Sequence, residues 1–174
     1  MRGSVASLPF DLVVRIEQVI GGGVIPTNME PTLDELYNEL KHEKKRLFQM
    51  DDKEKGKFSS KMAKALQLAI KLEQLTVEGE LRIWASLISL LPKSDRKMHA
   101  IKAVTILEKQ GNSSLFANAL ETLAALNSHV FKDPTIANID LIKKAITIRS
   151  TNDEYENLLD MVWAQRLLAE LEEE

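Results

Sequence analysis

Glu39 and His42 have the residue types and the spacing of a metal site. A di-iron centre in a helical bundle needs this Glu-x-x-His spacing on two helices, so that each helix supplies two inward ligands. Neither His99 nor His129 has a glutamate three residues before it. Because a single match of so short a pattern is usually accidental, we predict no metal site.

Two further patterns contain residues that bind magnesium or phosphate in other proteins. Asp51 and Asp52 form an acidic pair, but Lys55 stands where a second acidic turn would be needed, so we predict a charged turn over 51–56. The three glycines at 21–23 lack the following lysine of a phosphate loop, and they indicate a linker.

The absence of cysteine excludes thiolate chemistry. We predict no catalytic residue, no cofactor and no enzyme, and the remaining alternative is a Ser/His/Asp site assembled by folding.

A basic segment over residues 41–64 is the first candidate for binding. Its lysines alternate with acidic residues, and Phe48 and Phe58 are its only aromatics. Lysines in the last turns of the helix expected after Thr32 would also complement its dipole. A solvated face is therefore favoured over a track for phosphates. If the segment does bind nucleic acid, the contacting residues are Lys44, Lys45, Arg46, Lys53, Lys55 and Lys57.

The C-terminal end is acidic, with glutamate at positions 170, 172, 173 and 174. Negative charge is unfavourable at the C-terminus of a helix, so these residues are not expected to stabilise the helix that carries them. A solubilising tail is the favoured interpretation, and a tail that binds a basic surface is the alternative.

A five-residue motif that begins with lysine and alanine occurs three times, at 64–68, 102–106 and 144–148. We call it the Lys-Ala motif. Each copy lies in an apolar pattern of helical period and is followed by a second apolar helix, with a spacing of about 40 residues. We predict an all-α fold of seven or eight helices, as a short stack of antiparallel helix pairs that is HEAT-like or armadillo-like, or an irregular bundle. The alternative to a true repeat is that lysine, alanine and an aliphatic residue suit any amphipathic helix.

Helix boundaries and core residues follow from caps, breakers and periodicity. Capping boxes at 32–35 and 151–154 start two helices. Gly79 is expected to mark the break between two helices, with one long kinked helix as the alternative, and Pro92 ends the second of them. We expect the third residue of each Lys-Ala motif, and both tryptophans, to be in the core. The expected core residues are Leu66, Val104, Ile146, Trp84 and Trp163, and the expected stripe of the middle copy is Met98, Ile101, Val104 and Leu107.

The first 30 residues are predicted to form a helical arm and a Gly/Pro linker, and residues 31–174 a single helical domain. The arm helix is apolar on more than one side, and the glycines at 21–23 give it freedom to reach a second copy. We therefore predict a homodimer or small oligomer; the alternative is that the helix packs on its own domain. The residues expected to associate are Phe10, Val13, Val14, Ile16 and Ile20.

Composition favours a protein that binds other molecules and does not span a membrane. No apolar run approaches the length of a membrane-spanning helix, no secretory signal is visible, and the lack of cysteine fits a reduced, cytoplasmic setting. Stacked helices offer a broad surface without a deep pocket. The leading prediction is a non-enzymatic interaction or scaffold subunit that binds a protein partner. The alternative is a nucleic-acid-associated helical subunit that uses the basic segment 41–64.

Overall fold

The computed structural model describes residues 30–132, 137–151 and 155–173. The chain divides into two units, Met1–Thr32 and Leu33–Glu174, and the fold described below is that of the second. The predicted arm helix, with its five candidate self-association residues, lies outside the described residues, as do most of the second capping box and its Glu154. The predicted division at residue 30 therefore stays a prediction.

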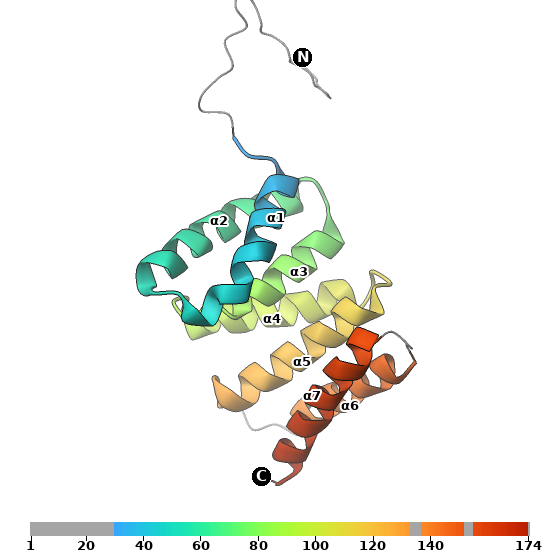
Figure 1. Cartoon of the computed structure of the whole chain (residues 1–174). Helices are drawn as coiled ribbons and strands as arrows, with labels where there is room; N and C mark the ends of the chain where they lie inside the picture. Colours follow the sequence, from blue (N-terminus) through green and yellow to red (C-terminus); the bar gives the residue numbers. More distant parts are fainter. Residues whose placement is uncertain (1–29, 133–136, 152–154, 174) are drawn as a thin grey trace, which may run out of the picture. The chain divides into compact units, whose positions relative to one another are not determined.

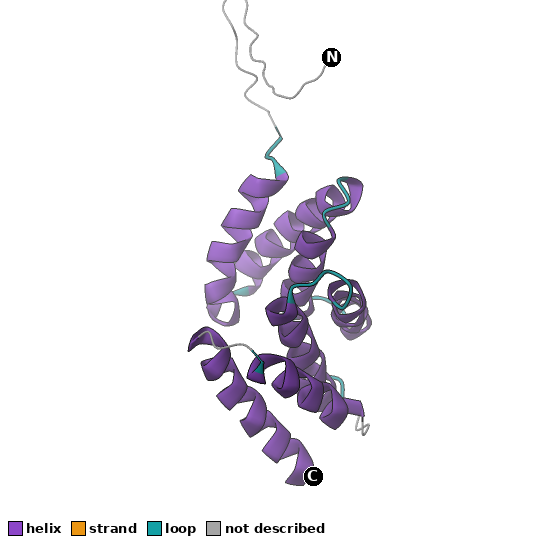
Figure 2. Cartoon of the chain, turned by 90° about the vertical axis from the view of Figure 1, so that its right-hand side faces the viewer, coloured by secondary structure: helices purple, strands orange, loops and turns teal. Residues whose placement is uncertain are grey.

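The described residues form seven α-helices and one short 3₁₀ helix, with no strand among them (Figures 1 and 2). The all-α prediction is confirmed. In chain order the elements are α1 (Leu33–Glu43), a 3₁₀ helix (Lys44–Gln49), α2 (Asp52–Lys71), α3 (Leu75–Ser86), α4 (Lys93–Leu107), α5 (Ser113–His129), α6 (Ala137–Ser150) and α7 (Tyr155–Glu173).

Each α-helix from α1 to α7 packs against the next one in the chain. Helices α3 and α5 also contact each other, and so do α5 and α7. The three Lys-Ala motifs lie on α2, α4 and α6, so motif-bearing helices alternate with the helices that follow them. This order is compatible with stacked helix pairs, while the HEAT-like or armadillo-like type stays a prediction.

The Lys-Ala motif has the same burial pattern in all three copies, with its lysine exposed and its alanine fully buried. The buried alanines are Ala65, Ala103 and Ala145. The third residue was expected in the core; Leu66 is buried there, but Val104 and Ile146 are only half-buried. Where two helices approach closely, a small side chain fits the contact and larger neighbours are displaced to its edge.

Gly79 lies inside α3, which corrects the prediction that it separates two helices. The break lies between α2 and α3, where Glu73 adopts a positive φ of 54°. A Cβ atom added to Gly79 would lie 2.6 Å from both Cγ and Cδ2 of Leu107 on α4. The glycine is therefore required by the close contact of α3 with α4.

We expect Gly79→Ala to destabilise the protein although alanine is the better helix former. Overpacking against the buried Leu107 costs about 1–3 kcal/mol, whereas alanine gains at most about 1 kcal/mol in a helix. Gly56 of α2 is the matched control, since nothing lies within 4 Å of an added Cβ there. Urea denaturation should show a loss of stability for Gly79→Ala and none for Gly56→Ala. Equal behaviour of the two variants would contradict the close contact.

Asp51 and Asp52 do not form the charged turn expected over 51–56. Asp51 is the N-cap of α2: its carboxylate accepts a hydrogen bond from the Glu54 backbone N–H at 2.8 Å, and the Glu54 side chain accepts one from the Asp51 N–H at 3.2 Å. This reciprocal pair satisfies two amides that the first turn leaves free. Helix α4 begins at Lys93, directly after Pro92.

A buried ion pair joins α5 to α6. The Arg149 guanidinium donates through Nε to Glu121 Oε2 at 2.7 Å and through Nη2 to Oε1 at 2.8 Å. Both side chains are almost entirely buried. Arg149 follows its Lys-Ala motif at the position that is Ala69 in α2 and Leu107 in α4, so one interior position of the stack carries a charge where the others are apolar.

Candidate binding surfaces

The histidines considered for a metal or catalytic site lie on three different helices of the described part of the chain. His42, His99 and His129 lie on α1, α4 and α5. Glu39 forms an ion pair with Lys61 at 2.8 Å. No group of three or more potential metal ligands occurs among the described residues.

The basic segment is partly engaged in contacts within the chain. Lys44 Nζ lies 5.0 Å from the centre of the Trp84 ring, Arg46 pairs with Glu54 at 3.1 Å, and Lys55 donates to Ser89 Oγ at 2.8 Å. Three of the six candidate phosphate contacts therefore hold other parts of the protein. The other three, Lys45, Lys53 and Lys57, are exposed and make no hydrogen bond or ion pair with the described chain.

Lys53 and Lys57 belong to a longer row on α2 that the sequence analysis did not identify. We define the lysine row as Lys53, Lys57, Lys64 and Lys71, all of which are exposed. Their separations of four, seven and seven residues place them within about 40° of one another around the helix. This spacing was visible in the sequence, whereas the lack of partners for these four lysines was not.

The outer face of α4 exposes two apolar side chains, Met98 at 37% and Ile101 at 45%. Both were expected in the core; the buried residues of α4 are instead Arg96, Ala100, Ala103 and Leu107. The matching positions, counted from the Lys-Ala motif, are Ser60 and Ala63 in α2 and Asp140 and Lys143 in α6, all exposed. Helix α4 thus presents large apolar groups where the other two motif-bearing helices present polar or small ones.

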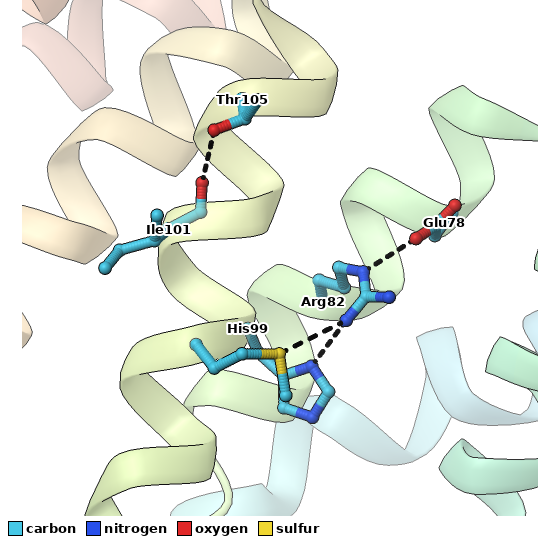
Figure 3. A network of polar contacts seen from close by, with 6 residues as sticks. Glu78, Arg82, His99, Ile101 and Thr105 are labelled. Atoms are coloured by element: carbon cyan, nitrogen blue, oxygen red, sulfur yellow. Dashed lines mark hydrogen bonds and ion pairs between the residues drawn. The ribbon is translucent and has the colours of Figure 1, made fainter.

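A polar network beneath this face links Arg82 of α3 to Glu78 and His99, and it also contacts Met98 (Figure 3). Buried Arg82 of α3 donates through Nε to Glu78 Oε2 at 2.8 Å. Its Nη1 contacts His99 Nδ1 at 3.0 Å and Met98 Sδ at 3.8 Å. A guanidinium only donates, so Nδ1 accepts and the ring is neutral. Burial lowers the pKa of His99, and the Arg82 charge lowers it further.

Trp163 lies on the surface of α7 and not in the core as expected, being 49% exposed. The buried residues of the described part of α7 are Ala164, Leu167 and Leu171. Beside the indole is a hollow of about 270 Å³, lined by His129, Trp163, Arg166, Leu167 and Glu170. Its polar lining mixes a cation, a carboxylate and an imidazole, so its charge does not select one class of ligand.

The acidic end lies near basic groups of the preceding helices. Glu170 Oε1 is 3.9 Å from His129 Nε2, and Glu172 Oε2 is 3.9 Å from Lys143 Nζ. All four side chains are more than half exposed, so each pair contributes little to stability.

None of the described helices combines the length and apolar character needed to cross a lipid bilayer. No family model matches the chain, and comparisons with curated proteins and with solved structures also give no match. The fold alone defines the class, an all-α protein of consecutively packed helices.

Proposed function

We propose that this chain is a non-enzymatic subunit that binds a protein partner through the outer face of α4. The observation that carries the proposal is the exposure of Met98 and Ile101 at positions where α2 and α6 are polar or small. Large apolar groups exposed side by side on a helix are typical of surfaces that another protein covers. Spaced three residues apart, they lie on one side of the helix.

The contacts of Met98 also favour binding. Its sulfur is held by Arg82, which is itself fixed by Glu78 and His99, so the surface loses little side-chain freedom when it is covered. Complete burial of a Met or Ile side chain contributes about 1.5–3 kcal/mol. Since both are already more than half buried, covering the pair would contribute about 2 kcal/mol.

The charges beside the pair define the chemistry of the partner. Lys102 is exposed and lies four residues after Met98 on the same side of α4, and exposed Lys109 follows the end of the helix. Asp95 is the exposed acid on that side, about one turn before Met98. A partner helix with apolar residues at i and i+3 and carboxylates toward the C-terminal half of α4 would match this surface.

Exchanging residues between equivalent helix positions tests the proposal. Met98→Asp with Ile101→Lys gives α4 the residues that α6 carries at these positions, and Ser60→Asp with Ala63→Lys is the matched control on α2. All four positions are exposed, so both double variants should fold. The partner is first captured from the native source and purified, and its affinity for each protein is then measured by calorimetry.

We expect the α4 variant to bind the partner at least about tenfold more weakly and the α2 control to bind like the parent protein. A partner that binds the α4 variant as tightly as the parent protein would remove this face from the interaction. Failure to capture any partner with the parent protein would argue against the protein-binding function itself.

A further inference from the structure

The lysine row is the longest uncompensated charge feature on the described helices. Lys71 lies 18 positions after Lys53 on α2, so the row is about 27 Å long at 1.5 Å per residue. None of its four members makes a hydrogen bond or ion pair with the described chain. Lys61 of the same helix, in contrast, is bound by two carboxylates of α1, Glu39 and Glu43.

Carboxylates are absent from the part of α2 that carries most of the row. No acidic residue occurs between Lys57 and Lys71, and the acidic Asp51 and Glu54 at the start of the helix cap each other. The positions equivalent to Lys57, Lys64 and Lys71 are Asp95 and Lys102 in α4 and Lys109 just after it, so an acid interrupts the pattern there. In α6 the motif lysine, Lys144, pairs with Glu108 at 3.6 Å. An uninterrupted row is thus particular to α2 among the three helices.

We propose that the lysine row binds the phosphate backbone of a single-stranded nucleic acid without sequence preference. Cations repeated along one side of a helix match a polyanion better than a compact anion, which would engage one or two of them. Steps of seven residues are about 10.5 Å, roughly three phosphates of a strand with one charge every 3.4 Å. Each lysine that neutralises a phosphate releases condensed counterions, which supplies the binding free energy.

The surroundings of the row favour nucleic acid over an acidic protein or an anionic membrane. Along most of the row the neighbours on the exposed face are Ser60, Ala63 and Gln67, which offer no large apolar group for a protein interface or for insertion among lipid chains. Exposed Ile70 and Leu72 lie only at the end of the row, beside Lys71. The apolar side of α2 is already used inside the protein, where Phe58, Met62 and Leu66 are buried.

Phe48 supplies the feature that distinguishes a single strand from a duplex. It is 82% exposed, lies on the 3₁₀ helix just before α2, and is five residues from Lys53. Exposed Lys45 is its neighbour on the same 3₁₀ helix. An aromatic ring beside a track of cations can stack on an unpaired base, and a duplex offers no such base along its length.

The test measures binding of the full chain to a labelled mixed-sequence DNA single strand by fluorescence anisotropy over a range of salt. The row variant carries Lys57→Gln, Lys64→Gln and Lys71→Gln. The control carries Lys93→Gln, Lys132→Gln and Lys143→Gln, which removes the same charge from exposed sites outside α2. Circular dichroism checks that both variants remain helical.

We expect the row variant to lose at least about tenfold in affinity at about 50 mM salt, and its logarithmic salt slope to fall by about 2, or 0.7 per lost phosphate contact. The control should stay within about twofold of the parent protein. Phe48→Ala should weaken single-strand binding about tenfold and leave duplex binding unchanged. Absence of binding by the parent protein at low salt, or equal losses in the row variant and the control, would overturn the proposal.

Two competitor probes separate the classes of polyanion. Poly-glutamate stands for an acidic protein, and vesicles of phosphatidylserine and phosphatidylcholine stand for a membrane. We expect both to bind more weakly than the oligonucleotide. If either probe binds more tightly than the oligonucleotide, and the row variant weakens that binding, then the lysine row binds an acidic protein or a membrane. The nucleic-acid assignment would then be wrong.

Discussion

Replacing Trp84 with alanine is expected to lower the free energy of unfolding by about 3–5 kcal/mol. The indole is 2% exposed, and the Tyr37 ring packs against it at a centroid distance of 5.4 Å. Lys44 lies over the same ring at 5.0 Å, so the side chain joins α1, the 3₁₀ helix and α3. Alanine would leave a cavity in the main core cluster. Urea denaturation followed by circular dichroism measures the loss.

Trp163→Ala is the matched control, because it removes the same side chain from a surface site. Trp163 is 49% exposed on α7, so we expect a loss of about 1 kcal/mol or less. Similar losses for the two variants would show that Trp163 is covered in solution. Repeating the Trp163 measurement over a range of protein concentrations would then establish whether a second copy covers it.

The helical fold could be predicted from the sequence, but the buried side of several helices could not. Periodicity located helices around all three Lys-Ala motifs, yet it ranked Met98 and Ile101 above Ala100 and Ala103 as core residues. Hydrophobic patterns favour the largest apolar groups, whereas closely packed helices place small residues at their contacts. The distance between two helices is a tertiary property that one helix does not encode.

Gly79 and Asp51 were misinterpreted for a related reason. A glycine is suited both to breaking a helix and to bringing two helices close together, and Gly79 does the second against Leu107. An aspartate is suited both to a solvated turn and to an N-cap. Asp51 is an N-cap, because it and Glu54 form two reciprocal hydrogen bonds between side chain and backbone. In both cases the residue type was informative, but its role depended on atoms that the local pattern did not identify.

The candidate surfaces could be predicted only in part. The basic segment was visible, but the partners that occupy Lys44 and Lys55 are Trp84 and Ser89, more than 30 residues away in the sequence. The four-seven-seven spacing of the lysine row was present in the sequence. Its lack of compensating carboxylates became visible only when the outer faces of α2, α4 and α6 were compared.

Breaking the buried pair between Arg149 and Glu121 is expected to cost about 3–5 kcal/mol in either single variant. Arg149→Leu leaves the Glu121 carboxylate buried without its bidentate partner, and Glu121→Leu does the same to the guanidinium. The charge that remains has lost both much of its solvation and its bidentate partner. Exposed pairs behave differently, so Glu108→Leu, which breaks the half-exposed pair with Lys144, should cost about 1 kcal/mol or less.

The double variant Glu121→Leu with Arg149→Leu separates the value of the pair from the cost of an isolated charge. Removing both ions removes both desolvation penalties, and leucine already occupies the position equivalent to Arg149 in α4, at Leu107. We therefore expect the double variant to be more stable than either single variant, with a coupling energy of several kcal/mol from the double-mutant cycle. Losses that simply add would mean that Arg149 and Glu121 stabilise the protein independently, through other contacts. A double variant more stable than the parent would show that the ion pair fixes how α5 and α6 meet at a cost in stability.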